Sequence, residues 1–139
     1  MRKDYMLLLA TLAVASLGAA CPIGTQLTSV EFVNNSTLSV DVQYFYGDDQ
    51  LAAKATLRLV GEEGNLTVPA GATRTLSLPC DELQAVYIEE ASLGLPGGLG
   101  PELDTDVLRD GTDFNCGDTV RYTFSGSLII DFSVDESVN

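Results

Sequence analysis

The sequence predicts an all-β fold, a single antiparallel β-sandwich of about seven strands over residues 27–139. Apolar and polar residues alternate with a period of two along several short stretches, which is the pattern of half-buried strands. Clusters of Gly, Pro, Asn and Asp separate these stretches about every 8–12 residues, as expected for a sandwich or barrel. No repeat or second domain interrupts the pattern, so we expect one domain.

The first strands lie on either side of an asparagine-rich turn. Val30 and Phe32 alternate with other residues, and residues 34–37 form a turn-like cluster. Residues 38–46 place Leu, Val, Val, Tyr and Tyr on one face. After a short acidic break, residues 53–60 alternate again. Their Ala, Leu, Lys and Arg content favours a helix, but the alternation favours a strand, which we predict.

Two bends precede the middle strands. Residues 61–64, Gly-Glu-Glu-Gly, predict a turn, and residues 68–72, Val-Pro-Ala-Gly-Ala, predict a second bend before a strand at 73–78. Such a Pro-Xaa-Gly bend resembles the corner of bacterial immunoglobulin-like sandwiches, which implies an immunoglobulin-like sandwich here. Residues 83–90 predict another strand. Residues 92–101 contain four Gly and two Pro and predict a loop.

A hairpin completes the predicted domain. Val120, Tyr122 and Phe124 alternate with polar residues, and Ser125-Gly126 predicts the turn. The returning strand is predicted at 128–134, where Leu, Ile, Phe and Val recur at every second position.

Residues 1–20 have the order of a secretory signal peptide. A basic start is followed by an apolar run from Tyr5 to Ala15 and by the small residues Gly18-Ala19-Ala20. The run is about eleven residues long, well short of the ~20 that a membrane-spanning helix needs. We therefore expect export of the chain.

Cys21 follows directly and has two interpretations. Residues 17–21, Leu-Gly-Ala-Ala-Cys, resemble the bacterial lipoprotein signal, in which a diacylglyceryl group is attached to the cysteine that becomes the first mature residue. The match departs from that pattern, because Leu17 stands four residues before the cysteine and Gly18 takes the usual leucine position. In this interpretation residues 21–26 are the lipid-attachment cysteine and a tether of at most ~20 Å. The alternative is a soluble secreted protein that begins at Cys21.

The cysteine count is consistent with lipidation. The chain has three cysteines, and an odd thiol in an exported protein requires an explanation. If Cys21 carries lipid, Cys80 and Cys116 remain as a pair in an oxidising compartment, where a disulfide is expected. In the soluble case, Cys21 is a spare thiol that pairs between chains.

The net charge restricts the partners. The chain carries −13, and without residues 1–20 five basic and nineteen acidic residues give −14. Such a surface repels nucleic acid and anionic lipid headgroups, so we expect no nucleic-acid partner. Contact with the membrane is then expected through lipid on Cys21, and the expected location is the cell envelope. The sequence does not specify a protein or glycan partner.

Residue types that support catalysis are scarce. The chain contains no histidine, which removes the commonest general base and transition-metal ligand. Lys54 is the only lysine after residue 20. We therefore predict that the protein is not an enzyme. A hydrolase based on a pair of carboxylates is the alternative.

The best candidate site is the acidic loop at 102–113. Its carboxylates and the turn-forming Gly111 suit Ca²⁺, which takes 6–8 oxygen ligands, although the spacing differs from that of an EF-hand. The candidate ligands are Asp104, Asp106, Asp110 and Asp113. The alternative is a solvated loop without metal, kept open by like charges and with Arg109 as a local ion-pair partner. No other cofactor is predicted.

Several motifs resemble small uncharacterised bacterial envelope lipoproteins and secreted proteins with a short disulfide-linked β-domain. They are an Asn-Asn-Ser-Thr turn at 34–37, the stretch 44–50, Asp81-Glu82 after Cys80, and Cys-Gly-Asp-Thr at 116–119. The resemblance spans most of the chain after residue 20. Its motifs are structural, and it implies no activity.

Three functional classes remain open. A non-catalytic binding or structural module, which we favour, predicts an exposed aromatic or acidic patch at one end of the sandwich. A calcium-dependent adhesion or binding module predicts that calcium raises the melting temperature and that Asp104→Asn with Asp106→Asn abolishes the rise. A hydrolase predicts two carboxylates that converge in a cleft.

Overall fold

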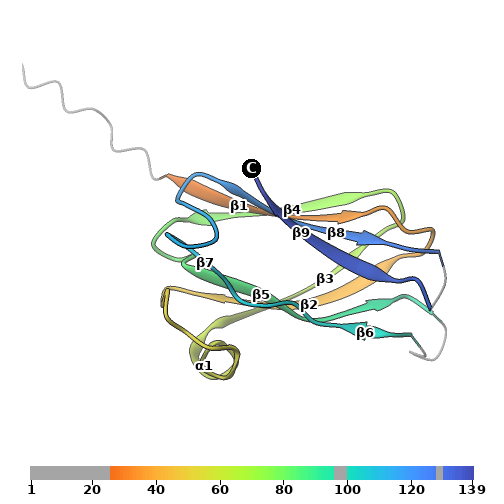
Figure 1. Ribbon diagram of the computed structural model, residues 1–139, viewed down its shortest axis with the longest axis horizontal. Helices are drawn as coiled ribbons and strands as arrows, with labels where there is room; N and C mark the ends of the chain where they lie inside the picture. The colour runs from red at the N-terminus through yellow and green to blue at the C-terminus, as the bar shows by residue number, and fades with distance from the viewer. Residues whose placement is uncertain (1–25, 96–99, 128–129) are drawn as a thin grey trace, which may run out of the picture.

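The computed structural model describes residues 26–95, 100–127 and 130–139. They form two β-sheets that face each other, with a short helix on the outside of one sheet (Figure 1). The all-β sandwich predicted from the sequence is therefore confirmed. The predicted signal peptide and Cys21 lie outside the described residues.

One sheet has β1 in a central position. Its order is β4 (Thr73–Pro79), β1 (Leu27–Asn34), β8 (Thr119–Ser125) and β9 (Ser133–Val138). β1 pairs antiparallel with β4 but parallel with β8. The parallel pair departs from the fully antiparallel prediction. It is possible because the chain passes through the other sheet between β1 and β8, and parallel neighbours need such a crossover.

The second sheet is built around β2 and β5. Its order is β3 (Glu62–Val68), β2 (Val40–Gly47), β5 (Ala85–Leu93) and β6 (Glu102–Leu103), and β7 (Leu108–Arg109) also pairs with β5. The described residues thus form nine strands, where about seven were predicted. Three strands were not predicted, namely β3 and the two-residue strands β6 and β7, and the strand predicted at 53–60 is absent.

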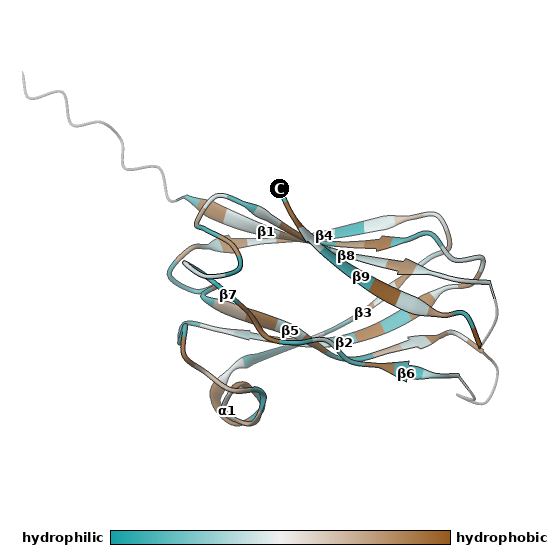
Figure 2. Cartoon of the chain, viewed as in Figure 1, coloured by the Kyte–Doolittle hydropathy of each residue, from teal (hydrophilic) through white to brown (hydrophobic). Residues whose placement is uncertain are grey.

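Aromatic rings connect the two sheets in the core. Phe32 on β1 lies with its ring centre 5.0 Å from that of Tyr44 on β2 and 5.9 Å from that of Tyr122 on β8. Phe32 and Tyr122 are 0% exposed. Figure 2 shows apolar and polar residues succeeding one another along the strands. The period-two alternation therefore places one set of side chains between the sheets, as predicted.

Residues 53–60 form a helix, so the predicted strand is wrong here. Helix α1 spans Lys54–Val60, and Leu57 is its buried residue. Leu57 packs in a second, smaller cluster with Phe45 and Tyr87, on the sheet face that points away from the main core. The helix thus covers two rings that would otherwise be exposed, and its composition agrees with its helical state. No helix among the described residues has the length and apolar character needed to cross a bilayer.

The predicted turn at 61–64 is largely strand. β3 begins at Glu62, and Gly64 stands directly opposite Tyr44. A Cβ on Gly64 would lie 2.1 Å from Cζ of the Tyr44 ring. The glycine is therefore required by the close approach of a ring and not by a bend, which is one of the uses of glycine inside a strand.

The strand predicted at 83–90 is displaced toward the C-terminus. β5 runs over Ala85–Leu93, so the first two residues of the predicted loop at 92–101 belong to the strand. Its register with β2 shifts between Gln43 and Tyr44, which marks a β-bulge. The extra residue on β5 keeps apolar side chains directed inward on both sides of the bulge.

The predicted hairpin between the last two strands is confirmed, but β9 lies later than the predicted range 128–134. Gly126 has φ +117°, a conformation that favours glycine, and ends β8. Phe132 precedes β9 and packs with its ring centre 6.4 Å from that of Phe124. Residues 128 and 129 lie outside the described residues.

Candidate functional site

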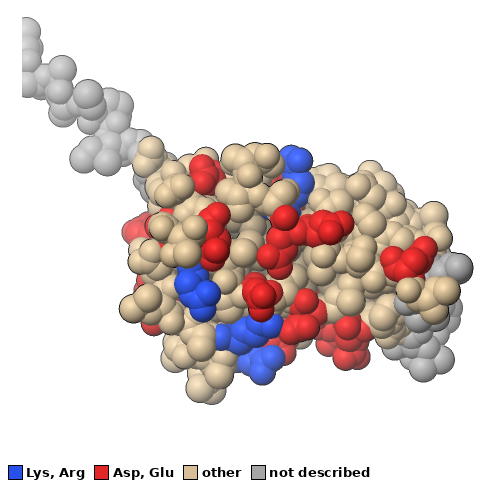
Figure 3. Space-filling model, viewed as in Figure 1, with Lys and Arg blue, Asp and Glu red and all other residues tan. Residues whose placement is uncertain are grey.

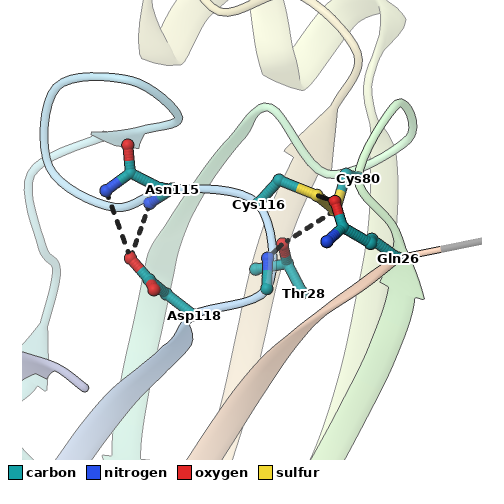
Figure 4. Close-up of a disulfide and its surroundings, with 7 residues drawn as sticks. Gln26, Thr28, Cys80, Asn115, Cys116 and Asp118 are labelled. Atoms are coloured by element: carbon teal, nitrogen blue, oxygen red, sulfur yellow. Dashed lines mark hydrogen bonds between the residues drawn. A yellow bond between two sulfur atoms is a disulfide. The ribbon is translucent and has the colours of Figure 1, made fainter.

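The predicted disulfide between Cys80 and Cys116 is present, with Cα atoms 5.3 Å apart. Cys80 follows the last residue of β4, and Cys116 lies in the turn that leads into β8 (Figure 4). β4 and β8 are the two neighbours of β1 in the sheet. The bond therefore ties the strands on both sides of β1 together at one end.

The beginning of β1 is held beside this bond. Thr28 is 0% exposed, and its hydroxyl donates to Sγ of Cys80 at 3.5 Å and accepts from the Gly117 N–H at 3.2 Å (Figure 4). The Cys80 N–H donates to the Gln26 carbonyl at 3.1 Å. Gln26, the first described residue, is thus held at this end of β1, and residues 21–25 of the predicted tether lie outside the described residues.

The turn that carries Cys116 is stabilised by its own side chains. The Asn115 N–H donates to Oδ2 of Asp118 at 2.7 Å, which closes the turn around Cys116 and Gly117. Gly117 has φ +96°, where a side chain would introduce strain. Residues 115–118 thus fix the backbone conformation of the turn that places Cys116 next to Cys80.

The four aspartates predicted to bind calcium have different surroundings. Asp104 forms a 2.7 Å ion pair with Lys54, and hydrogen bonding to that ammonium lowers the pKa of the carboxyl. Oδ2 of Asp113 accepts the backbone N–H of Arg109 at 2.8 Å. Across the described residues, no group of three or more His, Cys, Asp or Glu side chains is arranged to hold a metal ion. Calcium binding by Asp104, Asp106, Asp110 and Asp113 stays a prediction.

Two of these aspartates border a hollow of about 570 Å³ beside the β9 edge. We call it the acidic hollow. It brings together α1, the segments around β7 and the edge strand β9, and Figure 3 shows acidic side chains gathered on the face over β9. Its charged and hydroxyl-bearing residues are Lys54, Asp106, Arg109, Thr112, Asp113 and Glu136.

Glu136 is the residue of the acidic hollow that the sequence analysis missed. It lies on β9 directly opposite Tyr122 of β8. Opposite residues of an antiparallel pair share a face, so Glu136 stands on the same face as the core residue Tyr122, but at the open edge, where its side chain stays exposed. Burial, and then the charge of Asp106, raises the pKa of its carboxyl. The signal was the alternation of positions 134, 136 and 138, which places a glutamate between two valines on one face of the strand.

Tyr122 lies beneath Glu136 and is 0% exposed. Its hydroxyl has no hydrogen-bond partner within the described part of the chain. The neighbouring Thr105 hydroxyl accepts from the Ile88 N–H at 2.9 Å and donates to the Asp106 carbonyl at 3.2 Å. Burial, and then the charge of Glu136, raises the pKa of Tyr122, so the phenol keeps its proton.

The basic side chains of the acidic hollow have other partners. Lys54 forms the ion pair with Asp104, and the guanidinium of Arg109 donates to two backbone carbonyls at 2.9 and 3.2 Å. Asp106 and Glu136 form no ion pair with any described basic side chain. Among the described residues, the hollow therefore presents two carboxylates that form no ion pair.

No protein-family model matches the chain, and no curated protein sequence matches it. Among solved structures, it is similar to the cytotoxin suilysin from Streptococcus suis, at 12% identity and a TM-score of 0.47 over 82% of this chain and 23% of that one. A candidate cell adhesion protein from Bacteroides uniformis matches at 15% identity and a TM-score of 0.46, over 82% and 50% of the two chains. The T6SS lipoprotein TssJ1 from Pseudomonas aeruginosa matches at 9% identity and a TM-score of 0.45, over 83% and 97%.

The chain spans about a quarter of the length of suilysin and half that of the adhesion protein. Likeness this distant specifies neither an activity nor a partner, because one fold supports many functions.

Proposed function

We propose that the chain is an exported bacterial envelope lipoprotein whose β-sandwich acts as a non-catalytic binding module. The observation that carries the proposal is the Cys80–Cys116 disulfide. Structural disulfides form and persist in oxidising compartments, which supports export through a signal peptide at 1–20. The bond also uses two of the three cysteines, so Cys21 is the thiol left for lipid attachment.

The position of the disulfide supports an anchor at Cys21. A tether over 21–26 reaches at most ~20 Å and would hold the domain close to the membrane. The domain begins at Gln26, next to the disulfide. A pulling force on the anchor would act first on β1. The two strands next to β1 are joined covalently at that end.

The surface supports binding in preference to catalysis. A histidine base is absent from the sequence. The acidic hollow presents Asp106 and Glu136 to solvent without an ion-pair partner among the described residues, which suits recognition of a positively charged group. This acidic patch is of the kind expected for a binding module.

The test is the intact mass of the chain extracted from the membrane fraction of its native host. We expect a polypeptide that begins at Cys21, carries a diacylglyceryl group and lacks two hydrogens because Cys80 and Cys116 are bonded. The matched control is Cys21→Ser, which should be recovered from the soluble exported fraction with the disulfide intact. An unmodified mass, or recovery of the natural chain only from the medium, would contradict the anchor.

A further inference from the structure

We propose that Leu51, Leu59 and Val60, which we call the apolar patch, contact the surface of the neutral phospholipid bilayer to which Cys21 is anchored. The proposal rests on the lipid anchor proposed above and adds the orientation of the domain on the membrane. The three side chains are 86%, 84% and 77% exposed. Leu51 directly precedes Ala52, which packs in the cluster beneath α1, so the whole patch lies at this helix.

Helix α1 has three distinct sides. Leu57 points to the sheet and is buried. Lys54 and Arg58, one turn apart, share a second side. Their charges are paired there with Asp104 and Glu89. The remaining side points away from the sheet, and its residues are uncharged and exposed: Ala55, Thr56, Leu59 and Val60. The outermost side of the helix is therefore free of charge, which suits contact with an apolar surface.

The apolar patch stands at the end of the sandwich where the described chain begins. Figure 1 shows α1 at the same end as the start of β1, on the other sheet. A hollow of about 300 Å³ is lined both by Val60 of α1 and by Glu82, two residues after Cys80. The Cys80 N–H in turn donates to the Gln26 carbonyl. An anchored chain would therefore enter the domain at the end that carries the patch.

The short tether favours a lipid surface as the partner. The residues from Cys21 to Gln26 span at most ~20 Å, so an anchored domain stays beside the bilayer. Tethering of this kind gives an effective concentration that is roughly millimolar. A contact made by a few apolar side chains is then sufficient to orient the domain, because the anchor has already brought the patch to the membrane.

The charges beside the patch favour neutral lipid. Asp48 and Asp49 stand just before Leu51, and Glu62 follows two residues after Val60. These carboxylates would be repelled by anionic headgroups. We therefore expect the patch to enter the boundary between headgroups and acyl chains of a zwitterionic bilayer, as the apolar faces of interfacial helices do.

The experiment places a tryptophan probe in the patch. The natural chain contains no tryptophan, so Leu59→Trp supplies the only one. The full lipidated variant, verified by intact mass, is reconstituted into phosphatidylcholine vesicles that contain lipid brominated on its acyl chains. The emission should move to shorter wavelength and be quenched by the brominated lipid. Replacing part of the phosphatidylcholine with phosphatidylglycerol should reduce the quenching.

Ile130→Trp is the matched control. Ile130 is 92% exposed, and it lies in the connection between β8 and β9. β8 begins beside the disulfide, so the connection that follows it lies at the opposite end of the sandwich. A tryptophan there should show the emission of a residue in water, with no quenching by the brominated lipid.

A further variant tests the other two members of the patch. In the Leu59→Trp chain, Leu51→Ser with Val60→Ser should lower the ratio of docked to undocked domain by about tenfold or more, because two apolar side chains are lost from the contact. The melting temperature in solution should not change, since both side chains are exposed.

Three results would overturn the proposal. They are absence of quenching at position 59, equal quenching at positions 59 and 130, and unchanged quenching after Leu51→Ser with Val60→Ser. An emission shift at position 59 that depends on protein concentration and not on lipid would overturn it in favour of contact between copies of the chain. If the intact mass shows no lipid, coupling of the Cys21 thiol to a maleimide lipid supplies the tether. Failure of the anchor is then distinguishable from failure of the patch.

Discussion

Glu136 occupies a position that favours its protonated form. Because burial and Asp106 raise its pKa above the ordinary value of 4.5, the folded chain binds this proton more tightly than the unfolded chain does. The ionised carboxylate therefore destabilises the fold at neutral pH. Glu136→Gln should raise the melting temperature there. The gain should shrink as the pH falls through the raised pKa and disappear below the ordinary value. Thermal melts between about pH 3 and about pH 8 measure this.

Asp135→Asn is the matched control, since this variant changes the net charge by the same amount at the neighbouring position of β9. It should alter the melting temperature little across the pH range. A lower melting temperature of Glu136→Gln at neutral pH would contradict the prediction, because it would mean that the ionised carboxylate makes favourable contacts in the free domain.

Tyr122 and Tyr87 form a matched pair of buried tyrosines. Tyr87 donates to Oε2 of Glu89 at 2.8 Å, whereas the hydroxyl of Tyr122 has no partner among the described residues. Tyr87→Phe should lower the free energy of unfolding by about 1 kcal/mol, and Tyr122→Phe should leave it unchanged or raise it by up to about 1 kcal/mol. Urea unfolding measures both. A loss in Tyr122→Phe as large as that in Tyr87→Phe would show that its hydroxyl is hydrogen-bonded in solution.

At this scale the sequence predicts only part of the acidic hollow. Asp106 and Asp113 belong to a visibly acidic loop, so they were candidates from the start. Glu136 was not, because its role depends on the register between β8 and β9, and a shift of one residue would turn it outward. The unpaired state of Tyr122 was equally hidden, since it depends on which groups the fold brings to its hydroxyl.

Leu57 is the buried side chain of helix α1. Leu57 is 1% exposed, whereas Leu59, two residues away, is 84% exposed. Leu57→Ala should therefore cost about 2–5 kcal/mol, the range for a buried leucine, and Leu59→Ala should change stability by no more than about 0.5 kcal/mol. Urea unfolding gives both values. Similar losses in the two variants would contradict the packing of α1 described above.

The same element shows where sequence patterns mislead. Residues 53–60 alternate as a strand would, yet only one of their apolar side chains in α1 is buried, so the alternation does not mark a face that packs. In β8 the alternation does correspond to burial, since Val120, Tyr122 and Phe124 are all 0% exposed. A period identifies a strand only where tertiary packing uses it, and packing is not visible in a short stretch of sequence.

For the whole molecule, the two-sheet architecture followed from the sequence but the order of strands did not. The parallel pairing of β1 with β8 joins residues about 90 positions apart, for example Val30 with Val120. No local pattern encodes so distant a partner. The disulfide was predictable because the parity of cysteines is a property of the whole chain, whereas its place beside β1 depends on the sheet order.

We expect the Cys80–Cys116 disulfide to contribute to the stability of the entire domain. The disulfide closes a separation of 36 residues, and its removal should lower the free energy of unfolding by roughly 3–4 kcal/mol through the entropy of the unfolded chain. The variant is Cys80→Ser with Cys116→Ser, measured by urea unfolding. Cys21→Ser is the control and should leave the stability of the domain unchanged, because residue 21 precedes the β-sandwich.

Hydrogen exchange tests whether the disulfide also holds β1 in place in the folded domain, in addition to its effect on the entropy of the unfolded chain. Thr28 and Ser29 of β1 lie at the end next to the disulfide. Their backbone amides should lose more protection in the double variant than the amide of Leu57 in helix α1, which packs on the other sheet. A uniform loss of protection would mean that the bond acts only on the unfolded chain. Loss concentrated in β1 would mean that the bond also holds this strand in place in the folded domain.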